Sequence, residues 1–415
     1  MLPSFLTQLV FAAAVLARST CHVKPGGSSK VDDAPAIIKA FDNCKHGGRG
    51  TFDNTTYHVN SVMDISGLND VEVDLKGTLL WSTDISYWLK HSLDVGYQNQ
   101  STAWILSGKN IHFDGHGYGT IDGNGWAWYK RHLGSNYPRR PHALTVKGSE
   151  GGSFRGLRFM RSQMWTLSVI HSKDVLFDDI YVNNLDESGH HSSNTDGADT
   201  IYSSNITFNN WRVVNGDDSI AMKANSTDIK ITNSVFYQGL GIAIGSIGQY
   251  KDRVEVVEGM KVDNVTFVGT THAIYFKTWT GESVNYPPNG GGGGLGHASN
   301  NHFKNIHLQD VSSTPFTISQ CTTYDRSNPN CTSSKFQIRD NHFENITGTL
   351  KKDVIVGFQC SAVAPCKNME FKGVDLKKSS GKGKPGQWLC GHVEDPKGWK
   401  CTGKACEKPS STGGC

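Results

Sequence analysis

One short pattern of apolar and polar positions recurs along most of the chain. It begins with Asn or Asp, continues with alternating apolar and polar residues, and closes at a Gly or Asn turn. Period-two alternation in short segments rich in β-branched and aromatic residues predicts strands. The clearest copies are Asn110–Asp114, Asp174–Asp178, Asn205–Asn209, Asp228–Thr232, Met260–Phe267, Asn301–His307 and Phe336–Phe343.

The spacing of these strands predicts their arrangement. They recur roughly every 20 to 40 residues, and no long stretch with a helical period separates them, so alternating strands and helices are not expected. Strands at about one coil's length predict an all-β, single-domain, right-handed parallel β-helix with coils about 4.8 Å apart. Ile206, Phe208, Ile229 and Ile231 would point into its core. A β-sandwich or a propeller is the alternative, although propeller blades need four strands of regular length.

Composition excludes some classes of function. The 415 residues carry 41 Lys and Arg against 38 Asp and Glu, and a net charge of +3 excludes a strongly basic nucleic-acid binder. The 46 glycines indicate many tight turns. Residues 350–415 hold 12 Lys against 6 acidic residues, so this segment is +6 and the remainder is −3. We interpret the charge of this segment as a solvated surface.

Residues 1–20 have the character of a secretory leader. Phe5–Leu16 is an apolar run too short to span a bilayer, and the small residues Ala17 and Ser19 suit a cleavage site. A buried N-terminal segment is the alternative. No later stretch reaches 18 consecutive apolar residues, so we expect a secreted, extracellular protein with no membrane contact.

The chain is therefore divided into three parts. Residues 1–20 are the expected leader, 21–380 the β-helix, and 381–415 a tail rich in Cys and Lys that packs on the helix or trails from it. Because an open β-helix with polar ends has no need of a partner, we expect a monomer.

Ten cysteines lie near the two ends of the chain, and none lies between 45 and 320. An even number in a secreted chain predicts disulfides. No CxxC pair has the spacing of a zinc site, so a metal site is not expected. We also expect no cofactor. The predicted pairs are Cys21 with Cys44, Cys321 with Cys331, and Cys360 with Cys366, while Cys390, Cys401, Cys406 and Cys415 pair among themselves in an order left open.

Seven N-x-S/T sequons predict a glycosylated surface. They are at Asn54, Asn99, Asn205, Asn225, Asn264, Asn330 and Asn345.

An unusual set of acidic residues lies between 186 and 218. Asp196 and Asp217 are 21 residues apart, which is about one coil, so stacked coils would place them on neighbouring rungs. Asp217 and Asp218 are adjacent and face one cleft only at a bend, which Gly216 permits. Converging carboxylates repel one another, so one stays protonated and the others ionised, as glycoside hydrolysis requires.

Two plainer interpretations of these residues remain. Asn, Asp and Gly favour turns, so any one of the aspartates could serve only a turn. Clustered carboxylate oxygens also suit calcium.

Several motifs in this region resemble the polygalacturonase family of glycoside hydrolases (family 28). The resemblance covers roughly residues 30 to 375. It implies a pectin-lyase-like β-helix, secretion, hydrolysis of pectin with inversion at the anomeric carbon, and no metal. The motifs are Gly119–Gly125 followed by Trp126–Tyr129, Asn194–Asp199, Gly216–Asp218 and Gly239–Gly248.

The resemblance also implies roles by motif position. Asp217 would be the general acid, and Asp196 and Asp218 would activate water. Asn194 would help to order the site. Lys277 lies where the family's Arg-Ile-Lys motif ends, and it would pair with a substrate carboxylate.

Three departures from the family pattern change the expected substrate. Leu240 replaces a His, Tyr275 replaces the Arg of Arg-Ile-Lys, and Ser219 replaces a Cys whose partner position falls near Phe236. The acids of the chemistry are kept while the residues beside them change. We count Leu240 and Tyr275 among the candidate substrate-binding residues, together with His191, which lies near the acids in the sequence.

The predicted function is that of an enzyme on pectic polysaccharide. The preferred reading is an exo-polygalacturonase (galacturan 1,4-alpha-galacturonidase) that removes galacturonate from a chain end. The alternative is a rhamnogalacturonan hydrolase, either an exo-rhamnosidase or an endo-enzyme, because Leu240 and Tyr275 suit a neutral, less polar sugar. A calcium-dependent pectate lyase and a non-catalytic pectin-binding β-helix are remote alternatives.

Overall fold

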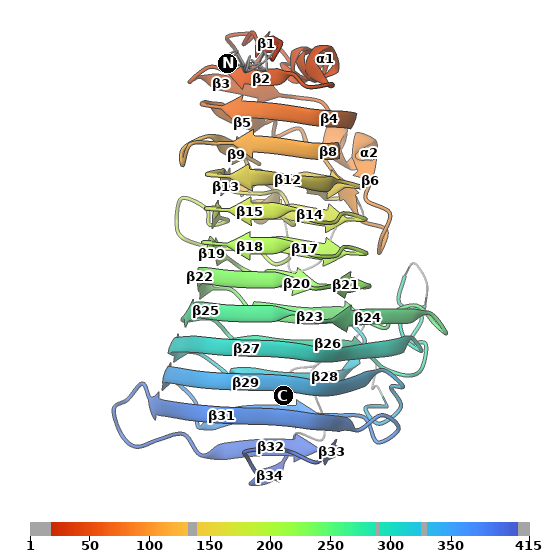
Figure 1. The fold of residues 1–415 in the computed structure, drawn as a ribbon, viewed down its shortest axis with the longest axis vertical. Helices are drawn as coiled ribbons and strands as arrows, with labels where there is room; N and C mark the ends of the chain where they lie inside the picture. Colours follow the sequence, from red (N-terminus) through yellow and green to blue (C-terminus); the bar gives the residue numbers. More distant parts are fainter. Residues whose placement is uncertain (1–17, 132–138, 288–289, 325–329, 406–415) are drawn as a thin grey trace, which may run out of the picture.

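The chain winds into a right-handed parallel β-helix whose coils stack along one axis (Figure 1). The computed structural model describes residues 18–131, 139–287, 290–324 and 330–405. Of the residues in the structure, 53% lie in strands and 6% in helices, which confirms the all-β prediction. One continuous sheet holds 31 strands.

Three rows of strands follow the axis. The row that carries the acidic residues is called the cleft sheet here. It contains the first part of β4 (Met63–Leu75) and of β8 (Trp104–Asp114), then β11 (Leu144–Lys147), β14 (Leu167–Ile170), β17 (Ala198–Ile201), β20 (Asp218–Met222), β23 (Gly241–Ile247), β26 (Ile274–Trp279), β28 (Phe316–Thr322), β30 (Val354–Gln359), β32 (Gln387–Gly391) and β34 (Gly403–Lys404).

The other two rows close each coil. One contains β1 (Thr20–Val23), β2 (Arg49–Phe52), β12 (Glu150–Arg155), β15 (Leu176–Asp178), β18 (Thr207–Asn209), β33 (Val393–Glu394) and parts of β4, β8, β22 (Lys230–Gln238), β25 (Lys261–Val268), β27 (Leu295–Val311), β29 (Gln337–Leu350) and β31 (Cys366–Lys378). The other contains β3 (Thr56–Val59), β5 (Thr78–Trp81), β9 (Thr120–Asp122), β13 (Arg158–Met160), β16 (Tyr181–Asn183), β19 (Arg212–Asn215) and the later parts of β22, β25, β27, β29 and β31. Two short strands, β21 (Ser226–Thr227) and β24 (Val254–Glu258), pair with each other in parallel. Strand β24 also pairs with the first residues of β27.

The core consists of like side chains stacked from coil to coil. Phe154, Phe177 and Phe208 follow one another with ring centroids 4.9 and 5.5 Å apart. Offset aromatic stacking adds to the free energy gained from burial. The predicted core residues Ile206, Phe208, Ile229 and Ile231 are all fully buried.

The turns explain why each repeat opens with Asn or Asp. Asp174, Asn205, Asn233 and Asn264 have φ values of 59°, 49°, 52° and 56°, in the left-handed region that these side chains tolerate. The Asn205 amide donates to Asp174 Oδ1 at 2.7 Å, and the Asn264 amide donates to Asn233 Oδ1 at 2.8 Å. The recurring residue therefore both turns the chain and links successive coils.

The helices and a small second sheet lie outside the stack. Helix α1 (Ala34–Cys44) packs at the N-terminal end (Figure 1), and α2 (Ile85–His91) and α3 (Trp126–Arg131) are short. The second sheet contains β6 (Leu93–Asp94), β7 (Ser101–Thr102) and β10 (Pro141–His142). In the loop between β6 and β7, Val95 and Tyr97 pack with Trp165, Ile170 and Ile201, so this loop covers part of the cleft sheet.

The predicted disulfides are confirmed where the structure describes them. Three predicted pairs form, and Cys390 pairs with Cys401. Cys406 and Cys415 lie outside the described residues. All seven sequon asparagines are exposed, which is compatible with the predicted glycosylation.

The first and last described residues join the stack. Most of the predicted leader, residues 1–17, lies outside the described residues. Arg18, at its end, pairs with Asp70 and Glu72 on β4. In the tail, β32 continues the cleft sheet by pairing with β30. Within the described ranges, no helix is long and apolar enough to cross a membrane.

Candidate active site

Three aspartates converge on the cleft sheet. Asp196 precedes β17, Asp217 precedes β20, and Asp218 is the first residue of β20. Strands β17 and β20 pair in parallel, so consecutive coils bring their N-terminal ends together. One oxygen of each carboxylate lies within 4.8 Å of the others. The arrangement expected from the 21-residue spacing is therefore present.

A local irregularity lets both Asp217 and Asp218 serve one site. The register between β20 and β23 shifts between Asp218 and Ile220, which breaks the alternation of a regular strand. Gly216 is required for a steric reason, because an added Cβ would lie 2.5 Å from Nδ1 of His191. The chain thus bends at the acids while another segment passes close by.

Backbone amides hold Asp217 in place. The N–H of Asn194 donates to Oδ2 at 2.8 Å, and the N–H of Asp218 donates to Oδ1 at 2.9 Å. Asn194 has a φ of 59°, a conformation that Asn tolerates well. Asn194 therefore orders the site through its backbone.

Two residues of β26 hold Asp218. The Tyr275 hydroxyl donates to Oδ1, and the Lys277 ammonium donates to Oδ2 at 2.9 Å. The same ammonium lies 3.3 Å from the Tyr275 oxygen. Tyr275 and Lys277 are two residues apart on the strand, so both project from the same face of the sheet. In this structure Lys277, expected from sequence to bind a substrate carboxylate, is paired within the protein.

Burial shifts the proton equilibria of these groups. Burial raises the pKa of Asp196 well above its usual value, and the charges of Asp217 and Asp199 raise it further. Burial and the neighbouring Asp218 also raise the pKa of Asp217. For Lys277, burial opposes the charge, but Asp218 outweighs it and the pKa is raised well above normal. The cluster therefore retains a proton at a pH where free aspartates are ionised.

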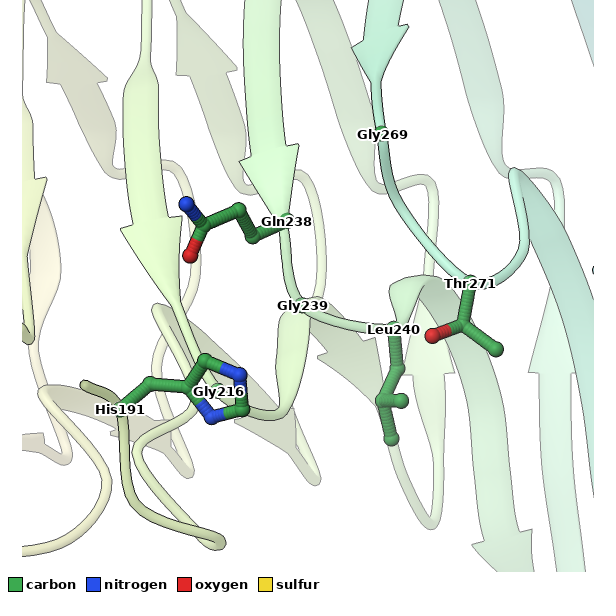
Figure 2. A pocket seen from close by; sticks show the side chains of 7 residues that line it. All are labelled: His191, Gly216, Gln238, Gly239, Leu240, Gly269 and Thr271. Carbon is green, nitrogen blue, oxygen red and sulfur yellow. The ribbon is translucent and has the colours of Figure 1, made fainter. Parts of the chain in front are cut away.

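Two other predicted binding residues line a pocket beside the acids. It has a volume of about 240 Å³ and is lined by His191, Gly216, Gln238, Gly239, Leu240, Gly269 and Thr271. Figure 2 shows His191 and Gln238 on one side of it, with Leu240 and Thr271 on the other. Leu240 also packs with Ala221, Ala243 and Tyr275 in a small apolar cluster. The wall next to the acids is thus apolar where the family pattern has a His.

A second charged pair, Asp199 and Lys223, was not singled out from the sequence. Asp199 is opposite Ala221 in the parallel register, and Lys223 follows two residues later on the same face. The Lys223 ammonium lies 3.3 Å from Asp199 Oδ1, and both side chains are almost fully buried. The signal was present, because Asp199 ends the Asn194–Asp199 motif and the alternation places Lys223 outward. Without knowledge of the register between coils, this signal could not predict that the two residues meet.

The three aspartates are also the one group of metal-ligating side chains found among the described residues. Carboxylate oxygens are the ligands that calcium and magnesium prefer. However, the Lys277 ammonium already occupies one oxygen of Asp218. Metal-free chemistry remains a prediction.

Comparison with other proteins places this chain in a family. The sequence pattern of glycosyl hydrolases family 28 matches residues 56–403. The chain belongs to this family. The family 28 relatives include an alpha-L-rhamnosidase, rgxB, of Aspergillus niger, which is 59% identical over 96% of this chain and 93% of its own length. A putative galacturan 1,4-alpha-galacturonidase A of the same organism is 37% identical over 94% of this chain and 96% of its own length.

A solved structure of family 28 agrees with the fold. The crystal structure of endo-xylogalacturonan hydrolase from Aspergillus tubingensis superposes with a TM-score of 0.79 at 25% identity. The superposition covers 93% of this chain and all of that one. Both the family membership and the fold expected from sequence are therefore confirmed, and the chain is a glycoside hydrolase.

The raised pKa of Asp196 predicts a pH-dependent cost in stability. An aspartate whose pKa rises on folding contributes stability at pH values below its pKa in the unfolded chain, which is near 4. This contribution is lost as the pH rises through the pKa of the folded state. Asp196→Asn should therefore be more stable than wild type at pH 7, by at least about 1 kcal/mol. The difference should shrink towards pH 4. Urea unfolding at several pH values measures it.

Asp74→Asn is the matched control. Asp74 is also buried, but its ion pairs with Arg49 and Lys76 and its contact with His116 lie on another face of the coils. Burial opposes the charge there, yet these partners lower the pKa. This variant should lose stability at neutral pH and approach wild type as the pH falls. An Asp196→Asn variant less stable than wild type at pH 7 would contradict the account.

Proposed function

We propose that the protein is a secreted, monomeric exo-hydrolase that releases terminal α-L-rhamnose from rhamnogalacturonan-type pectic chains. The observation that carries this proposal is the similarity to a relative named alpha-L-rhamnosidase, which far exceeds that to the relatives named for galacturonides. The exo-polygalacturonase preferred from the sequence is thus less well supported than its alternative.

The site beside the triad supports a substrate less charged than polygalacturonate. Leu240 and Tyr275 stand where the family pattern has a His and an Arg. Lys277 remains, but its ammonium is bound to Asp218. Fewer free cations face the cleft, so neutralising a row of galacturonate carboxylates becomes harder.

The chemistry assigns a role to each aspartate. Asp217, the most exposed of the three, gives its proton to the glycosidic oxygen as the bond from that oxygen to the anomeric carbon breaks. Asp196 and Asp218 orient a water that attacks the anomeric carbon, and one of them takes its proton. The raised pKa of Asp217 keeps the proton available for this step.

Closure of one end of the cleft supports exo-action. Next along the axis from Asp199 on the cleft sheet comes Ser168, which is fully buried. The stacked rings of His142 and Trp165 lie there, with centroids 4.4 Å apart, and His142 Nδ1 bonds to the Ser168 hydroxyl at 2.7 Å. A chain that cannot pass these rings presents only its terminal sugar to the acids.

Product chromatography tests the proposal. We expect the purified protein to release free rhamnose from rhamnose-terminated rhamnogalacturonan oligosaccharides from the first time point, and to release little galacturonate from polygalacturonate. Asp217→Asn should lower the rate by at least about 100-fold, because the general acid is lost. Chelator should leave the rate unchanged. Galacturonate as the main early product would restore the exo-polygalacturonase reading.

The stereochemistry of the product tests the roles of Asp196 and Asp218. Family resemblance implies inversion, yet the carboxylate oxygens lie within 4.8 Å of one another, closer than the roughly 6.5–9.5 Å usual for inverting enzymes. We propose inversion because Tyr275 and Lys277 already occupy the oxygens of Asp218, which makes it a poor nucleophile. Proton NMR of the first product should show β-rhamnose, and α-rhamnose would show retention.

A further inference from the structure

The buried pair Asp199 and Lys223 has no part in the proposed chemistry. Asp199 is fully buried and Lys223 is 4% exposed. The Lys223 ammonium lies 3.3 Å from Asp199 Oδ1 and 4.6 Å from the centroid of the Trp165 ring. It also donates to the carbonyl oxygen of Gly245 at 3.4 Å. These residues form a wall next to Asp196, on the side of the closed end.

Several polar atoms of this wall have no hydrogen-bond partner. Apart from the ion pair with Lys223, neither oxygen of Asp199 accepts a hydrogen bond, and the same holds for Asp196 Oδ1. The indole nitrogen of Trp165 and Nε2 of His142 are also buried without a partner. Folded proteins pair nearly all buried polar groups. Such a cluster of free acceptors and donors beside a reaction centre indicates a polar ligand.

The charge of the region restricts that ligand. Four carboxylates lie here (Asp196, Asp199, Asp217 and Asp218), against the ammonium groups of Lys223 and Lys277. The buried guanidinium of Arg140 lies near His142 and donates to the carbonyl oxygens of Gln163 and Ser193. Each ammonium is paired with a carboxylate of the protein. A uronic acid bound here would add a negative charge where the lysines and Arg140 of the described residues are already engaged within the protein. A neutral sugar adds none, and its hydroxyl groups can donate to the free carboxylate oxygens.

We propose that Asp199 and Lys223, with Trp165 beside them, bind the terminal sugar and select a neutral deoxyhexose over a uronic acid. This inference rests on the proposed function. Asp199 accepts hydrogen bonds from neighbouring hydroxyls of the ring and Lys223 donates to one ring oxygen, while the Trp165 ring, stacked on His142, holds the Lys223 ammonium in place. Lys223 therefore balances the charge of Asp199 and leaves its oxygens free as acceptors.

The test combines protein variants with hydroxyl deletions in the substrate. The substrates are a rhamnosyl-galacturonate disaccharide and analogues that lack the 2- or the 3-hydroxyl of the rhamnosyl ring. For wild type, removal of at least one of these hydroxyls should lower kcat/KM by at least about tenfold, because Asp199 is left without its donor. For Asp199→Asn, kcat/KM for the full substrate should fall similarly, and the hydroxyl deletion should matter much less.

A purely structural role gives a different result. If Asp199 only supports the fold, Asp199→Asn lowers kcat/KM for all substrates by one factor and leaves their ratio as in wild type, which would overturn the inference. Asp74→Asn, a buried paired acid on another face, should keep the wild-type ratio. If wild type does not cleave the full disaccharide, the proposed function fails instead.

A measurement without variants covers the case in which Asp199→Asn does not fold. L-rhamnose should raise the melting temperature of the wild-type protein at millimolar concentration, and sodium D-galacturonate should not. An equal or larger shift with galacturonate would overturn the selection proposed for the Asp199–Lys223 pair.

Discussion

Parallel backbone pairing between successive coils is the constraint on which the rest of the structure depends. Paired residues of successive coils lie one strand spacing apart, about 4.8 Å, so a side chain on one coil lies directly above its partner on the next. Where the repeated residue is apolar, this gives the stack of Phe154, Phe177 and Phe208. Where it is acidic, the same pairing forces Asp196 against Asp217 and Asp218.

The acidic part of this stacking opposes stability and forms the candidate reaction centre. Burial and mutual repulsion raise the pKa values of Asp196 and Asp217, and burial raises that of Asp199 to about 7, with Lys223 opposing it. The hydrophobic core on the other side of the same strands maintains the fold against this cost. Burial and neighbouring charges thus let these aspartates hold a proton beside the cleft.

The pairing of two lysines with aspartates determines how much positive charge the site can offer to a sugar. Lys277 neutralises Asp218 and Lys223 neutralises Asp199, so the cations of the site are engaged within the protein. Leu240 and Tyr275 add an apolar wall. Under the proposed function, the family's chemistry is kept while its attraction for carboxylate-bearing sugars is weakened, in line with the similarity to a relative named as a rhamnosidase.

Sequence predicted the features that depend on local pattern. Alternation identified the strands and the inward residues such as Phe208, the motifs identified the three aspartates, and the cysteine spacing gave three disulfides. It did not reveal that Lys277 binds Asp218 or that Asp199 meets Lys223. Coil lengths vary along the chain, so the register that decides these contacts is fixed only in three dimensions. The loop that brings Tyr97 over the cleft sheet was missed for the same reason.

The most direct test of this account is a crystal structure of Asp217→Asn with a rhamnose-terminated rhamnogalacturonan oligosaccharide. The rhamnosyl ring is expected to lie between Asp196 and the Asp199–Lys223 pair, with its hydroxyls on Asp199 and the glycosidic oxygen facing residue 217. A galacturonate carboxylate bound to Lys223 in that place, or a chain that continues past Trp165, would contradict it.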